Sequence, residues 1–426
     1  FQTDNKSRWL KFKWTTRVIV FIAVILIAVF ITMFIIDRIP SVPFRQDYRS
    51  AMTASKPFLQ ETKYSREYKG FRKFISEKKQ HSNYAEEKMK KLRRLRRFDN
   101  SDSLLEKNMN SWTDFSAGIR AGFYVSWDPK SFNSLRRNIS NLNLVMPEWM
   151  FLDPKTGGIK MNVDHKGLTL MRKSGVPIMP ILTNNVNQVF RGDIVSHILH
   201  NPSKRKALVN QIVTLCQKNK FIGINIDFEE MIENSDEYLI AFMKELSTAM
   251  HSKGLLVTED VEPFNEDYNY KELAKYVDYL VLMAYDEYSM SSDPGPVSSQ
   301  KWIEAALDKT AKDVPNNKII LGLAAFGYDW SDSPDGNVSL TYQAALSKAA
   351  EGSSKINFDN DTYNLNYAYR DERDFLHQVY FTDAATTFNV MRFGAEYGIA
   401  GFGLWRMGSE DDRIWRYYAK DMEDDP

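Results

Sequence analysis

Short apolar runs alternate with longer amphipathic stretches over residues 118–418, and this alternation constrains the fold more than any other feature. Each run has the length and composition of a buried strand. The expected strands are Arg120–Ser126, Leu144–Phe151, Pro177–Thr183, Ile222–Asp227, Leu255–Asp260, Tyr279–Ala284, Lys318–Leu323 and Ile399–Leu404. Helices are expected between them, for example over Lys204–Lys218, Asp236–Lys253 and Thr382–Tyr397. Eight strands separated by helices predict an α/β protein with a closed parallel (β/α)8 TIM barrel.

One interval in this alternation is longer than the others. The interval between the seventh and eighth expected strands includes about residues 329–380 in addition to the expected helix. We expect an inserted α+β subdomain there, so the barrel domain over residues 118–418 carries one insertion.

A run of 19 uncharged residues, Val18–Ile36, precedes the barrel and is rich in Ile, Val and Phe. At about 1.5 Å rise per residue, a helix of this length spans the hydrocarbon core of a bilayer. Basic residues crowd before it, so the positive-inside rule predicts a cytoplasmic tail over residues 1–17 and an external barrel. A cleaved signal peptide is the alternative, but the run is long for one and no small-residue cleavage site follows.

Charge divides the chain into two physically different parts. Residues 1–110 hold 24 Lys and Arg against 11 Asp and Glu, whereas the remainder holds 32 against 44. Residues 37–117 are therefore predicted to be a basic stalk or linker, and residues 419–426 an acidic tail. The cluster Lys88–Arg97 is either a solvated stalk helix or a contact for anionic lipid or an acidic polymer. Nucleic acid is not an expected partner outside the cytoplasm.

Cysteine and histidine usage excludes several classes of function. Cys216 is the only cysteine, so an internal disulfide is impossible, and we expect this residue to be buried in a helix. The six histidines are scattered without metal-ligand spacing, and the sequence contains no Gly-rich phosphate or dinucleotide loop. The sequence therefore predicts no metal and no cofactor.

The fourth expected strand ends in residues that can carry chemistry. Side chains alternate across a strand, so Asn225, Asp227 and Glu229 leave it on one face, while Ile224 and Ile226 line the other. Burying unpaired charge is costly, which favours a functional reason for this row. The alternative is a core strand whose terminal acids pair with arginines at the surface.

Other strands also end in aromatic, carboxylate or amide side chains, and in a parallel barrel these ends meet on one rim. They are Tyr124, Ser126 and Trp127 after strand one, Glu148–Trp149 on strand two, Thr183–Asn185 after strand three, Met283–Glu287 after strand six, Phe326–Trp330 after strand seven and Trp405–Arg406 after strand eight. Aromatic faces can stack on sugar rings, while carboxylates bond hydroxyl groups and transfer protons. The rim therefore predicts a carbohydrate site.

Four of these segments resemble motifs of glycoside hydrolase family 18, the chitinase-like enzymes. Ile222–Glu229 is similar to the strand-four motif Asp-x-x-Asp-x-Asp-x-Glu, and Met283–Asp286 to Met-x-Tyr-Asp on strand six. Gly401–Trp405 resembles the strand-eight ending, and Gly322–Trp330 resembles the Gly-Tyr-Asp-Trp segment of the branch that includes spore-cortex N-acetylglucosaminidases. The resemblance covers about residues 118–418 and implies a hydrolase of β-linked N-acetylglucosamine polymers, which the expected membrane segment would anchor.

The sequence departs from this family pattern at two places. Ile222 and Asn225 stand where the family has its first and second aspartates, and Leu182–Asn185 replaces a Ser-x-Gly-Gly motif on strand three. Asparagine at the second position is similar to the spore-cortex branch. Because Asn225 cannot accept a proton, we expect it to hydrogen-bond Asp227 and fix its rotamer.

The resemblance implies a role for individual residues. Glu229 is the general acid, Asp227 holds the substrate acetamido group and stabilises an oxazolinium cation, and Tyr285 donates to the acetamido oxygen. The residues expected to bind the sugar are Asn225, Asp286, Trp405, Glu148, Trp127 and Tyr328. Packing alone is the alternative for Tyr285 and Trp405, and barrel-mouth ion pairing for Glu148.

The membrane segment and barrel together also resemble the first part of large bacterial polysaccharide synthases. This resemblance implies a single-pass protein of the bacterial inner membrane, with its barrel in the periplasm or outside the cell. It also implies a deacetylase or glycosyltransferase as partner or as a C-terminal continuation, although no motif of either is present. Two other functions stay open: a non-catalytic barrel that binds or guides polysaccharide, and a structural protein of an envelope complex.

Overall fold

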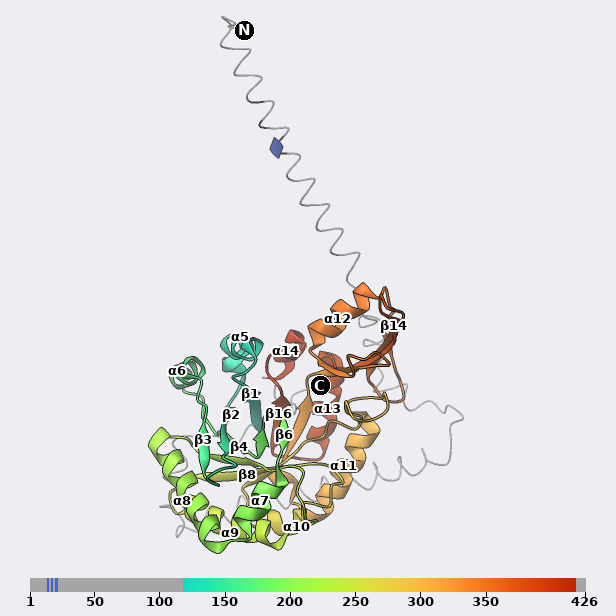
Figure 1. The fold of residues 1–426 in the computed structure, drawn as a ribbon. Helices are drawn as coiled ribbons and strands as arrows, with labels where there is room; N and C mark the ends of the chain where they lie inside the picture. The colour runs from blue at the N-terminus through green and yellow to red at the C-terminus, as the bar shows by residue number, and fades with distance from the viewer. Residues whose placement is uncertain (1–13, 15–16, 18–19, 22–117, 419–426) are drawn as a thin grey trace, which may run out of the picture.

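The computed structural model describes residues 118–418, together with residues 14, 17, 20 and 21 (Figure 1). Apart from these four positions, the expected tail over 1–17, the expected membrane segment Val18–Ile36 and the stalk over 37–117 with Lys88–Arg97 lie outside the described residues, as does the acidic tail over 419–426. In the described part of the chain, no helix is long and apolar enough to cross a membrane.

Eight parallel strands close into a barrel, which confirms the predicted fold class. The strands are β1 (Ile119–Tyr124), β2 (Leu144–Leu152), β4 (Ile181–Thr183), β7 (Gly223–Asp227), β8 (Leu256–Val261), β9 (Tyr279–Leu282), β10 (Ile319–Ala324) and β16 (Gly401–Trp405). They pair in chain order, and β1 pairs with both β2 and β16, which closes the barrel. The barrel strands agree with the predicted runs to within a few residues, except that β4 begins at Ile181 rather than at Pro177.

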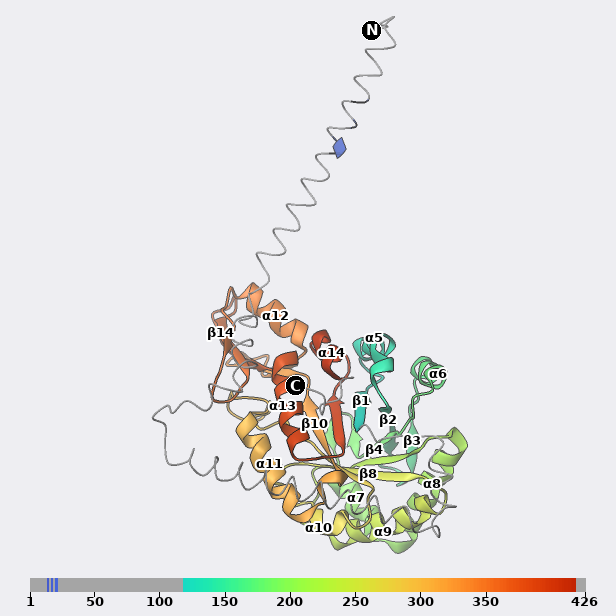
Figure 2. The same cartoon turned by 180° about the vertical axis from the view of Figure 1, so that it is seen from behind.

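Helices surround these strands, as both views show (Figures 1 and 2). They are α5 (Pro129–Asn138), α6 (His165–Ser174), α7 (Gly192–Leu199), α8 (Pro202–Asn219), α9 (Glu237–His251), α10 (Tyr270–Leu273), α11 (Gln300–Asp313), α13 (Ala384–Glu396) and α14 (Trp415–Tyr418). Polar caps begin several of them; Asn201 caps α8, for example, by accepting from two backbone N–H groups. Cys216 is fully buried in α8, as the sequence predicts.

Two short antiparallel pairings add to the barrel strands. The short strand β3 (Ile159–Met161) pairs antiparallel with β2. The strands β5 (Asn185–Val186) and β6 (Val189–Phe190) form a hairpin between β4 and α7. Neither element was visible in the sequence, because two or three residues give no readable periodicity.

Side chains of the barrel strands alternate between its interior and the surrounding helices. In β8, Leu256 packs in the interior core, whereas Val257 and Val261 pack in the outer core against the helices. The same alternation directs Asp260 inward and Glu259 outward. Glu259 is 1% exposed and neither carboxyl oxygen has a hydrogen-bond partner, so burial raises its pKa to about 8.

An antiparallel sheet and a helix lie between β10 and α13, where the sequence predicts an α+β insertion. In sheet order the strands are β12 (Val338–Leu340), β11 (Gly327–Ser331), β15 (Leu376–Phe381), β14 (Leu365–Arg370) and β13 (Asn357–Phe358). The helix α12 (Tyr342–Glu351) packs on this sheet and shares a small apolar core with it. Because β11 begins at Gly327, the element starts two residues before the predicted boundary at 329.

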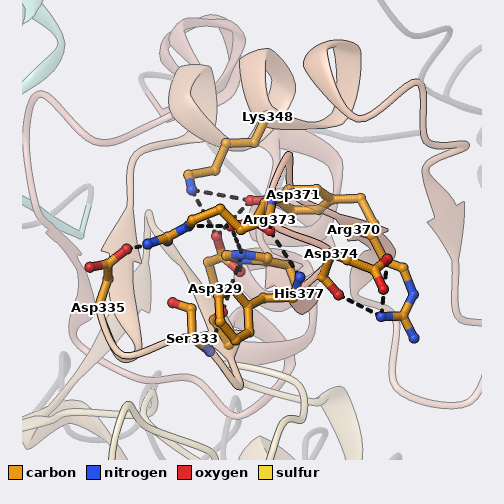
Figure 3. Close-up of polar contacts among 12 residues, drawn as sticks. Asp329, Ser333, Asp335, Lys348, Arg370, Asp371, Arg373, Asp374 and His377 are labelled. Carbon is orange, nitrogen blue, oxygen red and sulfur yellow. Dashed lines mark hydrogen bonds and ion pairs between the residues drawn. The ribbon is translucent and has the colours of Figure 1, made fainter.

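A buried carboxylate links four elements of this insertion (Figure 3). Asp329 of β11 is 1% exposed and accepts from His377 Nδ1 of β15 at 2.9 Å. It also accepts from Lys348 Nζ of α12 at 2.9 Å and from the Tyr369 hydroxyl of β14 at 3.1 Å. These partners offset the cost of burying the charge, so Asp329 is accounted for by the architecture of the insertion.

Candidate active site

The predicted catalytic row lies at the carboxyl end of β7. Asn225 and Asp227 face the barrel interior and are 0% and 8% exposed, while Ile224 and Ile226 pack outward against the helices. Glu229 follows the strand and is half-buried. The Asp227 carboxylate forms side-chain hydrogen bonds with Glu229 and with Thr183 of β4. The structure therefore brings the two carboxyl groups into direct contact.

The electrostatics of this pair suit an acid next to an anion. Burial and then the negative charge of Asp227 raise the pKa of Glu229 well above its ordinary value. Burial also raises the pKa of Asp227, to about 7, but its hydrogen bonds to Glu229 and Thr183 act in the opposite direction. Asp227 therefore loses its proton first, and Glu229 keeps the proton that a general acid needs.

Asn184, one of the residues expected on the rim after strand three, holds the backbone of Glu229. The Glu229 N–H donates to Asn184 Oδ1 at 3.0 Å, and Asn184 Nδ2 donates back to the Glu229 carbonyl at 2.8 Å. Asn184 is fully buried, directly after β4. The segment Leu182–Asn185, which replaces the family's Ser-x-Gly-Gly motif, thus holds both Asp227 and Glu229.

Asn225 bonds a different carboxylate from the one expected. The sequence suggested a hydrogen bond to Asp227, but Asn225 Nδ2 donates to Asp260 Oδ2 of β8 at 2.6 Å. Its Oδ1 accepts from the Thr258 hydroxyl at 2.6 Å. The reason is geometric: Asn225 is in register with Thr258, and both point into the barrel.

Asp260 interacts electrostatically with Asp227 of the predicted catalytic row. It is 3% exposed, and its Oδ1 has no hydrogen-bond partner. Burial and then the charge of Asp227 raise its pKa well above the ordinary value. The Oδ1 of Asp227 is likewise buried without a partner. A buried carboxyl group with a raised pKa thus lies beside the row, one strand away from the family motif.

Two further residues lie near Glu229 that were not predicted from the sequence. Glu262, just past β8, forms a side-chain hydrogen bond with Glu229, and burial raises its pKa. The buried Tyr268 hydroxyl donates to the Phe228 carbonyl at 2.9 Å and so holds the chain between Asp227 and Glu229. The alternation along strand five could have marked Asp260 and Glu262 as inward-facing, but nothing local in the sequence marks Tyr268.

The end of strand six supplies a phenol and another carboxylate. Tyr285 is 8% exposed, and burial and the charges of Asp260 and Glu229 raise its pKa well above normal, so it stays a hydrogen-bond donor. The Tyr328 hydroxyl of β11 donates to Asp286 Oδ1 at 2.6 Å. Asp286 is exposed as a whole residue, but the surrounding protein desolvates its carboxylate. This desolvation raises the pKa of Asp286 to about 6.

Two tryptophans complete the rim. Trp405, at the end of β16, packs edge-on against Phe123 with ring centroids 5.5 Å apart. Trp127 is 60% exposed; its Nε1 donates to Glu148 Oε2 at 2.7 Å, and the Arg406 guanidinium lies 4.3 Å from its ring centroid. The charge of Glu148 also raises the pKa of Asp227, which places it near the catalytic pair.

A (β/α)8 barrel with paired inward carboxylates and aromatic side chains at the carboxyl ends of its strands is the architecture of a glycoside hydrolase. Residues 173–411 match the family model described as glycosyl hydrolases family 18, and the chain belongs to that family. This assignment agrees with the resemblance carried by the motifs on strands four, six, seven and eight.

Known proteins of this kind match most of the barrel. The chain is 28% identical over 318 residues to the uncharacterized glycosylase YvbX of Bacillus subtilis, covering 72% of this chain and 92% of that protein. It is 25% identical over 265 residues to the cortical fragment-lytic enzyme of Bacillus subtilis, covering 58% of this chain and 60% of that protein. The crystal structure of a chitinase from Chromobacterium violaceum superposes with a TM-score of 0.67 at 26% identity, over 72% of this chain and 100% of that one.

Proposed function

We propose that the protein hydrolyses β-linked N-acetylglucosamine polymers, with the 2-acetamido group of the substrate as nucleophile and with retention of configuration. The observation that carries this proposal is the buried, hydrogen-bonded pair of Asp227 and Glu229 at the end of β7. The similarity to a cortical fragment-lytic enzyme and to a chitinase supports the same substrate class.

In this mechanism the glycosidic bond breaks as a proton moves from Glu229 to the leaving oxygen. The acetamido oxygen of the substrate attacks the anomeric carbon, which forms an oxazolinium ion that Asp227 stabilises by its negative charge. Tyr285 donates a hydrogen bond to the acetamido oxygen. Glu229, now a carboxylate, removes a proton from the water that opens the oxazolinium, and this step restores the acid.

The remaining rim residues would bind the polymer. Trp405 would stack beneath the reacting sugar, and Asp286, held by Tyr328, would accept from a sugar hydroxyl. Trp127 offers an exposed aromatic face whose orientation is fixed by Glu148 and by the Arg406 guanidinium. This face would support a neighbouring sugar.

Asp260 would hold the proton that the family's second aspartate holds elsewhere. Asn225 cannot take up a proton, but it donates to Asp260 Oδ2 and leaves Asp260 Oδ1 free to carry one. The carboxyl groups of Asp260 and Asp227 each keep one buried oxygen without a partner, and the charge of Asp227 raises the pKa of Asp260. Asp260 therefore replaces, from the neighbouring strand, the function lost at Asn225.

Replacement of Asp260 tests this role. Asp260→Asn keeps the volume and the site's shape but removes the titratable group, so we expect kcat to fall by on the order of 10²-fold with little change in KM. The pH profile of kcat should also change shape, because one ionisation is lost. A uniform decrease in kcat with an unchanged profile would mean that Asp260 only supports the packing around Asn225.

The proposed activity is tested with the full chain and a panel of N-acetylglucosamine oligomers. The expected outcome is cleavage with retention of the anomeric configuration. NMR of the newly formed reducing ends measures that configuration. Binding of the oligomers without any cleavage would instead favour the non-catalytic, polysaccharide-binding barrel.

We propose from the sequence that residues 18–36 anchor the protein in the bacterial inner membrane, with the barrel in the periplasm or outside the cell. The barrel would then act within a polysaccharide synthesis or modification system that includes a deacetylase or glycosyltransferase. The charge distribution around the apolar run supports this orientation. Protease added to cells with a permeabilised outer envelope should digest the barrel; protection until the inner membrane is lysed would reverse the orientation.

A further inference from the structure

A histidine and two carboxylates gather outside the barrel interior, where α7 ends and α9 begins. His200 follows the last residue of α7, and Asp236 is the N-cap of α9. Glu233 lies between the catalytic acid Glu229 and Asp236 in the loop that follows β7. The helices α7 and α9 pack side by side (Figure 1), so residues 36 positions apart in the sequence meet in space.

The three side chains direct their ligand atoms toward one point. His200 Nε2 lies 3.1 Å from Asp236 Oδ2 and 3.9 Å from Glu233 Oε2, and all three atoms lie within 4.8 Å of one another. Ligands bound at about 2.0–2.2 Å to one tetrahedral or octahedral ion are separated by roughly 3–3.5 Å. The Glu233 side chain is 53% exposed, so its rotation can bring the carboxylate closer to the other two ligand atoms.

Two of the ligands are held in place before any ion binds. Asp236 is 2% exposed, and its Oδ1 accepts from the Tyr238 N–H at 2.7 Å, which directs Oδ2 toward the histidine. The His200 ring packs against the Tyr238 ring with centroids 4.2 Å apart. Ser196 Oγ lies 3.4 Å from the same ring nitrogen and adds another oxygen to its surroundings.

Charge at this point also favours a cation. The imidazole of His200 lies within ion-pair distance of both carboxylates, those of Glu233 and Asp236. Two carboxylates beside one imidazole nitrogen form a mixed oxygen and nitrogen donor set, which suits a divalent transition metal. Imidazole disfavours Ca²⁺ and Mg²⁺, which prefer oxygen ligands alone.

We propose that His200, Glu233 and Asp236 bind a divalent transition-metal ion of the Zn²⁺ class. The ion would tie the end of α7 to the start of α9 and so fix the loop that leads away from Glu229. That loop already packs tightly against α7, since a Cβ on Gly192 would lie 1.9 Å from the Glu230 carbonyl oxygen. The proposal concerns binding and does not depend on the proposed hydrolase activity.

Isothermal titration of the metal-free full chain with Zn²⁺ tests the site. His200→Ala should remove one bound equivalent, or weaken it by at least about tenfold. Asp236→Asn should do the same without loss of the α9 cap, because asparagine caps a helix as well as aspartate does. His165→Ala, at the exposed start of α6, is the matched control and should leave binding unchanged, and Ca²⁺ should not compete.

Thermal unfolding provides a second readout, because an ion that binds the folded state raises Tm. The expected result is a Zn²⁺-dependent increase in Tm for the wild type and the control, and none for His200→Ala. The proposal is overturned if the wild type binds no Zn²⁺. It is equally overturned if His200→Ala and Asp236→Asn bind as the wild type does, since the ion would then occupy other carboxylates, such as those inside the barrel.

Discussion

Glu229→Gln is expected to abolish most hydrolysis while the protein still binds acetylated oligomers. Glutamine keeps the shape of the side chain and can still bond Asp227, but it has no proton to give to the glycosidic oxygen. General acid–base catalysis contributes about 10²–10⁴ in rate, so kcat should fall by that order. Single-turnover cleavage and oligomer binding, measured on the same preparation, separate the two effects.

The neighbouring residue supplies a matched control. Glu230 follows directly in the chain but is exposed, so Glu230→Gln should change kcat little. The wild-type rate should fall as pH rises through the raised pKa of Glu229, because the acid then loses its proton. Substantial cleavage by Glu229→Gln, or an equal loss in Glu230→Gln, would remove Glu229 from the role of acid.

The barrel was predictable because its signal is repeated eight times. Each strand is an apolar run of similar length, and errors at single boundaries do not change the topology. The inward row of Asn225, Asp227 and Glu229 was predictable for a related reason, since alternation along one strand fixes which side chains share a face. The structure places Asn225 and Asp227 in the carboxyl half of β7 and Glu229 just after it.

The partners of this row could not be read from the sequence, because they come from other strands. Asn225 bonds Asp260 rather than Asp227, since the register of β7 with β8 decides which side chains meet. Asn184 holds the backbone of Glu229 from the loop after β4. These contacts depend on the relative positions of strands, which alternation within one strand does not contain.

Asn225 shows why a departure from a family motif has to be judged in three dimensions. In the sequence it stands where the family motif that it resembles has an aspartate. In the structure the carboxyl group of buried Asp260 accepts from the Asn225 amide at 2.6 Å, and the charge of Asp227 raises the pKa of Asp260. If Asp260 holds the proton as proposed, the asparagine at position 225 does not by itself argue against activity.

Removal of the acetyl groups from the polymer is expected to stop hydrolysis by the wild-type protein. In the proposed mechanism the acetamido oxygen forms the bond to the anomeric carbon, so a free amine leaves no nucleophile in place. Asp227 cannot replace it in this scheme, because its charge stabilises the cation that the acetamido group becomes. Fully deacetylated oligomers should therefore resist the protein, whereas fully acetylated oligomers of equal length should be cleaved.

The design separates loss of chemistry from loss of binding. A deacetylated oligomer that binds without being cut acts as a competitive inhibitor, and inhibition of acetylated-oligomer cleavage measures that binding. Asp227→Asn should mimic the same defect from the protein side, since the oxazolinium loses its counter-charge while the acetylated oligomer still binds. Cleavage of the deacetylated oligomer at a comparable rate would require a protein nucleophile or a directly activated water. In that case the spacing of the paired carboxylates would decide the stereochemistry: about 5–5.5 Å for retention and about 6.5–9.5 Å for inversion.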